Sequence, residues 1–304
     1  MKRFIQKLGP GLLFAGAAIG VSHLVQSTRA GADFGFGLLW ALVLIHLVKY
    51  PFFQFGPRYA SATGESLLEG YQKLGKWVLI LYGLLTSLTM FTIQAAVTIV
   101  TAGIATSLFG DFISVKLWTV VILSVCFIIL NIGKYRFLDV MMKVIIITLT
   151  LTTLIATAMA IYNSKEIGSF TQLLPQGSLE ITFLIAFMGW MPAPLDISVW
   201  HSLWTTEKQK TSNEKHNPKI ALLDFNIGYL GTILLGISFV ALGALVMHPT
   251  GNSFSTSAGT FSIQLIEMYT QSLGNWAYLI IGIAAFTTMF STTLTTLDAS
   301  PRSM

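Results

Sequence analysis

The sequence predicts an all-α integral membrane protein, a helical bundle with about eight spanning helices and the pattern of an inverted repeat. Hydrophobic residues make up 54% of its 304 residues and charged residues only 10%, whereas a soluble domain carries about 25% charged residues. The chain contains stretches of about 20 apolar residues, the length that crosses a bilayer, and two of them are interrupted. This composition excludes a soluble enzyme, a nucleic-acid-binding module and a disordered protein.

The apolar stretches follow one another with short polar breaks. The first follows the basic start MKRFIQK and is too long for a signal peptide, so we interpret it as a membrane span. We expect spans over residues 10–30, 36–55, 77–107, 117–132, 141–162, 178–204, 220–248 and 275–299.

The basic residues predict the orientation of the chain in its membrane. Of the 18 Lys and Arg residues, only Arg29, Lys116 and Lys165 fall in segments on one side, and the rest, Lys49 among them, are assigned to the other. The positive-inside rule places the N-terminus in the cytoplasm of a multi-pass protein of the plasma or inner membrane. The net charge of +5 is therefore a topology signal and indicates no nucleic-acid partner.

Two spans carry features that break a helix. The first has small and polar residues in FAGAAIGVSHLVQSTRAGA, and the sixth has Pro192 and Pro194 in FMGWMPAPLDISVWHSLW. Because proline lacks an amide hydrogen and displaces the carbonyl four residues earlier, Met188 and Trp190 lose their helical partners. Such backbone persists in a bilayer only where it lines a cavity or meets a ligand. Breaks in the first and sixth spans are typical of secondary transporters with a site at the midplane.

The sequence around the first break resembles the Nramp family of divalent-metal transporters. GPG (9–11) is followed by LLFAGAAI, then GVSH (20–23), then LVQSTRAGA (24–32), with the family's spacing and no gap. The third span ends in the family-like IATSLFG (104–110), and the sixth carries the family's Met-Pro pair as Met191 and Pro192. The resemblance covers essentially the whole chain and is strongest over residues 9–70.

This resemblance implies a leucine-transporter-type fold in one domain, 1–304, with a first five-helix repeat over 1–163 and a partial second repeat over 164–304. It implies a secondary transporter of the symport kind that moves a divalent metal cation by alternating access, with the metal as substrate and no cofactor. The fold needs five spans plus five inverted ones. The chain supplies five plus three, so we expect it to be a fragment.

The departures from the family pattern fall at the site itself. Gly20 and His23 stand where the family has its metal-binding Asp and Asn, and Ala193 replaces its His. The methionine ligand is retained as Met191, and the carbonyl that the family offers falls on Met188. Acidic residues of the family's third helix, which serve proton passage, align near Gln94 and Val97. These changes put proton-coupled manganese or iron transport in doubt.

His23 and Met191 are the candidate metal ligands. An ionisable side chain at mid-membrane depth is costly and usually functional, and imidazole with thioether favours softer transition metals over magnesium or calcium. The alternatives are a neutral histidine bonded within the bundle and a methionine that fills the core. The candidate substrate-binding residues are therefore Gly20, His23, Met188, Met191 and Asp196.

Asp196 follows the sixth-span break and has two interpretations. It either replaces the missing aspartate as anionic ligand or proton carrier, or it caps the second half-helix, where an acid is favourable.

Other polar residues in the spans have plainer interpretations. Ser291, Thr292 and Thr295 either line a cation site or satisfy helix backbone, and we favour the second. We treat His46 and His201 as structural, and we expect Asp224 and Lys219, at the cytoplasmic end of the seventh span, to be solvated.

Nothing in the sequence predicts an enzyme, because GxSxG, Walker and HExxH motifs are absent. A single cysteine, Cys126, excludes a disulfide framework and a cysteine metal site. Two alternatives to divalent-metal transport stay open. One is a relative that transports magnesium or a sodium-coupled organic solute, and the other is a non-transporting membrane sensor or subunit.

Overall fold

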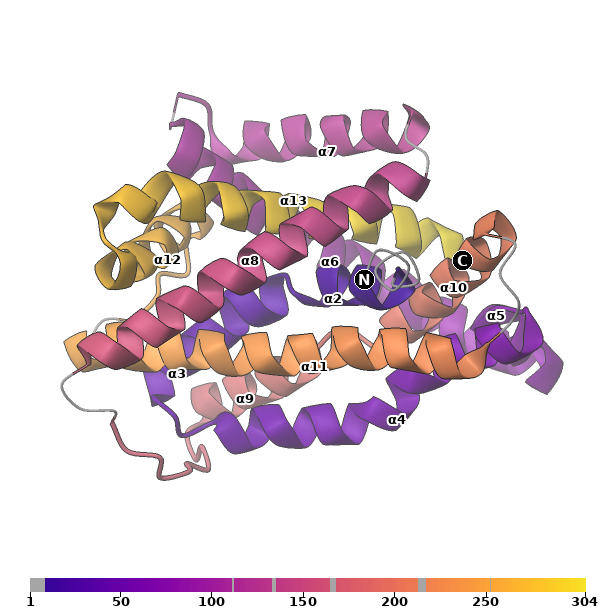
Figure 1. Ribbon diagram of the computed structural model, residues 1–304, viewed down its shortest axis with the longest axis horizontal. Helices are drawn as coiled ribbons and strands as arrows, with labels where there is room; N and C mark the ends of the chain where they lie inside the picture. The colour runs from indigo at the N-terminus through magenta and orange to yellow at the C-terminus, as the bar shows by residue number, and fades with distance from the viewer. Residues whose placement is uncertain (1–8, 111, 133–134, 165–167, 213–216, 252) are drawn as a thin grey trace.

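The computed structural model describes residues 9–110, 112–132, 135–164, 168–212, 217–251 and 253–304, and this part of the chain is helical with no strand. Six basic residues that entered the orientation argument lie outside these ranges: Lys2, Arg3, Lys7, Lys134, Lys165 and Lys215. Figure 1 shows the arrangement. The helices are α2 (Pro10–Ala18), α3 (Thr28–Phe34), α4 (Leu39–Thr63), α5 (Leu67–Leu74), α6 (Lys76–Phe109), α7 (Val115–Ile132), α8 (Tyr135–Asn163), α9 (Ser178–Trp190), α10 (Ile197–Ser212), α11 (Pro218–Leu242), α12 (Ala258–Leu273) and α13 (Tyr278–Arg302), with short π or 3-10 turns η1 (Val21–Ser27), η2 (Gly243–Met247), η3 (His248–Thr250) and η4 (Asn275–Ala277).

The predicted apolar spans all appear as helices. Five stretches are long and apolar enough to cross a membrane by length and composition: Pro10–Phe34, Leu39–Thr63, Lys76–Phe109, Pro218–Thr250 and Asn275–Arg302. The other three predicted spans contain the shorter apolar helices Val115–Asn131, Ile147–Asn163 and Ser178–Trp190. The prediction of an all-helical, multi-pass membrane protein is confirmed.

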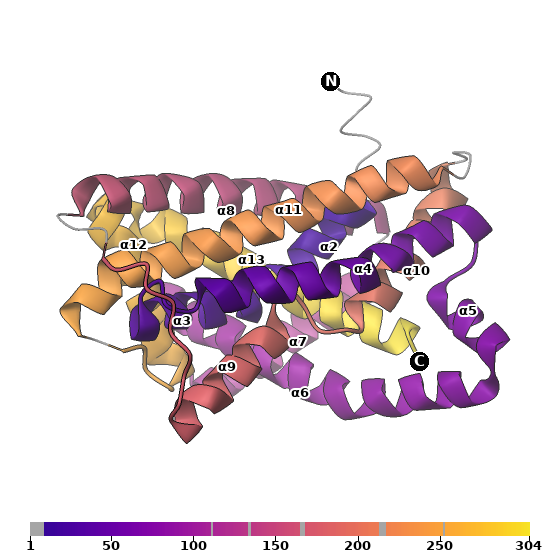
Figure 2. The ribbon, with the colours of Figure 1, turned by 90° about the horizontal axis from the view of Figure 1, so that it is seen from below.

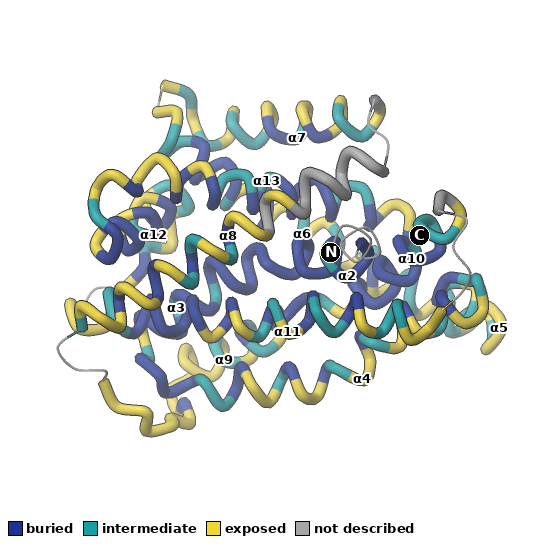
Figure 3. The backbone as a smooth tube through the Cα atoms, viewed as in Figure 1, coloured by how far each residue is buried: buried dark blue, intermediate teal, exposed yellow. Residues whose placement is uncertain are grey.

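The first span forms the centre of the bundle. Its most apolar window is 83% buried, against 28% for the window in α4. In Figure 3 the tube through α2 and α3 is dark blue along most of its length, whereas α4, α7 and α8 carry exposed residues. α2 packs against α11, α8, α10 and α13. The interrupted helix is therefore enclosed by protein and has little surface left for lipid.

Glycine pairs bring the first span into backbone contact with α11 and η2 at both of its ends. A Cβ built on Gly11 would lie 2.1 Å from the Asp224 carbonyl oxygen, and one on Gly228 would lie 2.1 Å from the Gly11 oxygen. At the other end, a Cβ on Gly31 would lie 2.0 Å from the Val240 oxygen. Only glycine fits at such an approach, because any side chain would collide with a carbonyl.

Both predicted helix breaks are present. α2 ends at Ala18, and the chain resumes as the π-helix η1 after Gly20. α9 ends at Trp190, and α10 begins only at Ile197, so the segment 191–196 with its two prolines is not helical. These breaks follow from the proline and glycine chemistry of the sequence.

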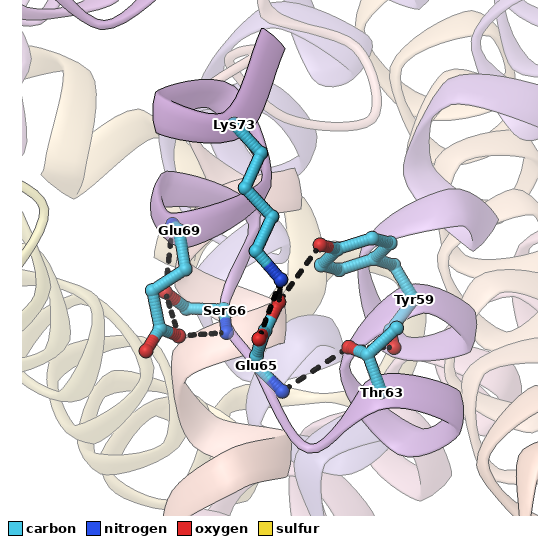
Figure 4. Close-up of polar contacts among 6 residues, drawn as sticks. All are labelled: Tyr59, Thr63, Glu65, Ser66, Glu69 and Lys73. Atoms are coloured by element: carbon cyan, nitrogen blue, oxygen red, sulfur yellow. Dashed lines mark hydrogen bonds and ion pairs between the residues drawn. The ribbon is translucent and has the colours of Figure 1, made fainter.

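Two helices were not predicted. α5 lies between α4 and α6 at one end of the molecule, as Figure 2 shows. Its start carries a capping box, in which Ser66 Oγ accepts from the Glu69 amide and Glu69 accepts from the Ser66 amide. Figure 4 shows this box beside the ion pair of Glu65 with Lys73. The other unpredicted helix, α12, packs on α6, α8 and α13.

The expectation that Asp224 is solvated is wrong. Asp224 is only 4% exposed, and its carboxylate accepts from the amides of Gly9 (3.2 and 3.3 Å) and Gly11 (2.9 Å). These amides begin α2 and have no helical partner. Asp224 therefore caps the first helix from α11, while its neighbour Lys219 is exposed as expected.

Candidate functional site

The two helix breaks meet at the centre of the bundle. Ser22 Oγ, at the start of η1, lies 3.2 Å from the Pro192 carbonyl oxygen in the sixth-span break. One π-turn later, Ser27 Oγ lies 3.9 Å from Met191 Sδ. Residues 170 positions apart in the chain thus form one polar contact zone between the broken segments.

His23 points into this zone and is fully buried. Its Nε2 lies 3.0 Å from the Thr232 carbonyl oxygen of α11, and its Nδ1 lies 2.7 Å from Ser22 Oγ and 3.1 Å from the Ala18 oxygen. Because a carbonyl only accepts, a neutral ring donates either from Nε2 to Thr232 or from Nδ1 to Ala18. In the tautomer protonated at Nε2, Nδ1 accepts from the Ser22 hydroxyl, and both nitrogens are then engaged within the protein.

Met191 and His23 both face Gly236 of α11. A Cβ built on Gly236 would lie 3.5 Å from Met191 Cε and 3.7 Å from His23 Cδ2. The structure therefore brings the two predicted metal ligands to the same small region. The atoms that approach Gly236 are the methyl carbon and a ring carbon, while the thioether sulfur faces Ser27.

Gly20 lies against α13. A Cβ at this position would be 2.8 Å from Thr292 Cγ2 and 2.9 Å from Thr292 Oγ1, and the Thr292 hydroxyl lies within bonding distance of the Gly16 and Thr288 carbonyls. The space beside the backbone at Gly20 is thus filled by a threonine. Ser291 and Thr295 bond to carbonyls of their own helix, as the plainer interpretation predicted.

A central cavity of about 20 Å³ lies between the first, third, sixth and eighth spans, which is room for about one water molecule. Ser22, Val97, Thr292 and Thr296 contribute to its lining. Beside it, Gln94 accepts from Thr296 Oγ1 at 2.7 Å. The third-helix position that carries an acid in the family pattern thus holds a neutral amide bonded to α13.

Asp196 is 8% exposed and lies on another side of the sixth-span break. Its carboxylate accepts from Thr86 Oγ1 and Thr89 Oγ1 of α6, each at 3.2 Å. It lines a cavity of about 730 Å³ whose other walls come from α4, α5, α6, α9 and α10. The carboxylate thus accepts hydrogen bonds from α6. The backbone carbonyl of Asp196 accepts from the Val199 and Trp200 amides in the first turn of α10.

Lys49 is the residue at this site that the sequence argument placed wrongly. It lies in the middle of α4, is 8% exposed, and does not belong to a cytoplasmic connection. Its Nζ donates to the carbonyl oxygens of Gly189 and Met191 (both 2.7 Å) and Met188 (3.1 Å), and lies 3.4 Å from the Ala193 oxygen. The carbonyl of Met188, expected to be free for a ligand, is therefore occupied by an ammonium group. A lysine within an apolar span is the signal that identifies it.

His46 and His201 are buried outside the contact zone. His46 Nδ1 bonds to the Leu42 oxygen at 2.7 Å, and His201 stacks on Phe14 with ring centroids 5.6 Å apart. Within the ranges that the structure describes, no three residues among His, Cys, Asp and Glu are grouped so as to hold a metal ion. A metal at the breaks would depend on sulfur, imidazole and carbonyl ligands.

The chain is similar to known proteins in sequence and in fold. The family model described as Nramp, natural resistance-associated macrophage protein-like, matches residues 11–301. An uncharacterised protein of Pasteurella multocida is 38% identical over 299 residues, which cover 97% of this chain and 69% of that protein.

Solved structures of similar fold include a mutant of the Eremococcus coleocola manganese transporter, with a TM-score of 0.72 at 15% identity over 97% of this chain. The same transporter in complex with an aromatic bis-isothiourea substituted compound gives 0.66 at 16% identity over 99% of this chain. The chain spans 64% and 63% of the length of these two structures. At this identity the likeness concerns the fold.

Proposed function

Because this chain belongs to the Nramp family, we propose that it is a secondary transporter that moves a divalent metal cation across its membrane by alternating access. The observation that carries the proposal is the meeting of the two helix breaks, where Ser22 approaches Pro192 and Ser27 approaches Met191. Broken helices facing one another at mid-membrane depth are where secondary transporters bind substrate.

The substrate would lie between η1 and the sixth-span break, with the Met191 sulfur and His23 Nδ1 as its distinctive ligands. An ion reaching Nδ1 must turn the Ser22 hydroxyl away. That hydroxyl already lies 2.5 Å from the Ala18 oxygen and 3.2 Å from the Pro192 oxygen, so it keeps a partner when it releases the ring. Ligand exchange therefore leaves no buried hydroxyl unpaired.

Alternating access would rest on two repeats, residues 1–163 and 164–304. α10 packs on α4, and α2 packs on α11; an inverted repeat would relate these two pairs, with the sixth and second spans repeating the first and seventh. We also propose that the N-terminus faces the cytoplasm of a plasma or inner membrane. Coupling to an ion gradient is part of the same proposal.

Manganese flux tests the proposal. The purified chain in liposomes should take up Mn²⁺, and Met191→Ala should weaken its apparent affinity by about tenfold or more, because a soft ligand is lost. Met268→Ala is the matched control, since Met268 is equally buried in α12 and its loss leaves a similar cavity. Equal uptake by both variants would remove Met191 from the site, and absence of uptake by the unaltered chain would refute transport.

A second candidate is a relative that transports magnesium or a sodium-coupled organic solute. It is favoured by the engaged nitrogens of His23 and the ammonium of Lys49 at the sixth-span carbonyls. Calorimetric titration of the purified chain with Mn²⁺, Mg²⁺ and Na⁺ separates the two. Heat of binding for Mn²⁺ alone supports the first candidate, and silence for all divalent ions removes it.

A further inference from the structure

The Lys49 side chain ends inside a ring of backbone carbonyls. The last turn of α9 contributes Met188 and Gly189, and the broken segment contributes Met191 and Ala193, with Nζ to oxygen distances of 2.7 to 3.4 Å. An ammonium has three N–H donors, so its hydrogen-bonding capacity is used in full. The ring offers four carbonyl acceptors, one more than the three N–H donors of the ammonium.

This ring has the chemistry of a cation site. The carbonyls at the end of a helix carry the negative end of its dipole. Unwound backbone and half-helix C-terminal ends hold monovalent cations in broken-helix transporters. Every oxygen in the ring is neutral, which suits a singly charged hard ion better than a transition metal. The positive charge that this site favours is supplied by the protein itself.

Within the part of the chain that the structure describes, Lys49 has no carboxylate partner. The ion pairs among the described residues, such as Glu65 with Lys73 and Asp298 with Arg302, do not include Lys49. Asp196, in the same broken segment, directs its carboxylate to hydroxyls of α6. On α4, His46 bonds through Nδ1 to the Leu42 oxygen, and the Tyr50 hydroxyl donates to Asn226 Oδ1. A buried ammonium without these carbonyls would be strongly unfavourable.

We propose that the Lys49 ammonium is a tethered monovalent cation filling a cation site formed by the carbonyls of Met188, Gly189 and Met191. A substrate cation then reaches the Met188 carbonyl only when Lys49 leaves it. The first statement stands on the geometry of the ring. The second rests on the proposed function, because it concerns the substrate.

Lys49→Met tests the first statement, since methionine keeps most of the side-chain length and removes the ammonium. The thermal unfolding temperature is measured in detergent in sodium, potassium, ammonium and choline chloride at equal ionic strength. The variant should be stabilised by one or more of the three small cations over choline, by roughly 2–4 °C for each tenfold rise above the dissociation constant. The unaltered chain should show no such preference.

Lys76→Met is the matched control, because Lys76 is exposed at the start of α6 and the same charge is lost. If the unfolding temperature of Lys49→Met depends on the cation no more than that of this control, the tethered-cation proposal is wrong. Should Lys49→Met fail to fold in every salt, Lys49→Gln keeps N–H donors without the charge and is judged by the same comparison.

Calorimetry with Mn²⁺ tests the second statement. Lys49→Met should bind Mn²⁺ at least about tenfold more tightly than the unaltered chain, because a nearby positive charge is gone, and Lys76→Met should not change. Cation-specific stabilisation of Lys49→Met with no Mn²⁺ binding by any variant would refute the proposed function and leave the tethered cation in place. Unchanged Mn²⁺ affinity in Lys49→Met would refute the competition.

Discussion

Single side chains decide how each broken helix ends. Asp224 reaches from α11 to the first amides of α2, and Lys49 reaches from α4 to the last carbonyls of α9. Each charge is opposite in sign to the helix end that it meets, which is the favourable arrangement. Both come from a neighbouring helix, so the ends of the broken spans are held by tertiary contacts.

Replacing the Asp224 carboxylate should loosen the start of the first span. Asp224→Asn keeps the shape and one acceptor but loses the charge, so we expect it to destabilise the chain by about 0.5–2 kcal/mol, as for other helix caps. Denaturant unfolding in detergent measures the change. Asp298→Asn is the control, because its ion pair with Arg302 is an i,i+4 surface pair worth about 0.3–0.5 kcal/mol. An equal loss in both variants would contradict the capping role.

The sequence predicts which segments form the candidate site, but it does not predict the contacts that their side chains make. Met191 and His23 lie near one another because their local motifs surround the two breaks, which meet. The hydroxyl partners of Asp196 lie on α6, 110 and 107 positions away, and the Lys49 contacts span 139 to 144 positions. No local pattern encodes such pairs. The metal-binding roles of Gly20, His23, Met188, Met191 and Asp196 remain predictions.

At the scale of elements, the breaks were predictable because proline and glycine act on the backbone within one turn. The short helices were not. α5 depends on a capping box rather than on apolar length, and α12 mixes apolar and polar residues because only part of its surface is buried. A search for spans of about 20 apolar residues passes over both.

The capping box of α5 gives a prediction about that helix alone. Ser66→Ala removes the side-chain acceptor of the Glu69 amide, which should cost about 1 kcal/mol. Since α5 has eight residues and only Leu67 buried, the loss should appear as faster hydrogen exchange of its amides. Ser66→Thr retains the cap and should exchange like the unaltered chain. Protection unchanged in Ser66→Ala would show that packing alone holds α5.

At the scale of the whole molecule, the described chain is organised around an enclosed first span, and the proposed orientation rests on charge. Because Lys49 lies within α4 and not in a connection, one basic residue fewer is assigned to the cytoplasmic side. The excess of basic residues on that side remains. The orientation therefore still predicts that α5 lies on the cytoplasmic side and residues 168–177 on the opposite side.

Cysteine labelling of intact cells tests this orientation. Cys126 is fully buried, so the unaltered chain should react little with a membrane-impermeant maleimide. Gln176→Cys, at an exposed position, should be labelled from outside, whereas Gln72→Cys, exposed on α5, should react only after permeabilisation. The reverse pattern would invert the proposed topology.

The glycine contacts between the first span and α11 limit how the bundle can move. Backbone meets backbone at Gly11 with Gly228 and at Gly31 with the Val240 carbonyl, on both sides of the break. Sliding one helix along the other by a residue would drive a Cβ into a carbonyl oxygen, and tilting α2 alone would open both contacts to solvent or lipid. These contacts hold the first and seventh spans together, so the rearrangement that the proposed alternating access requires would move them as one body against the rest.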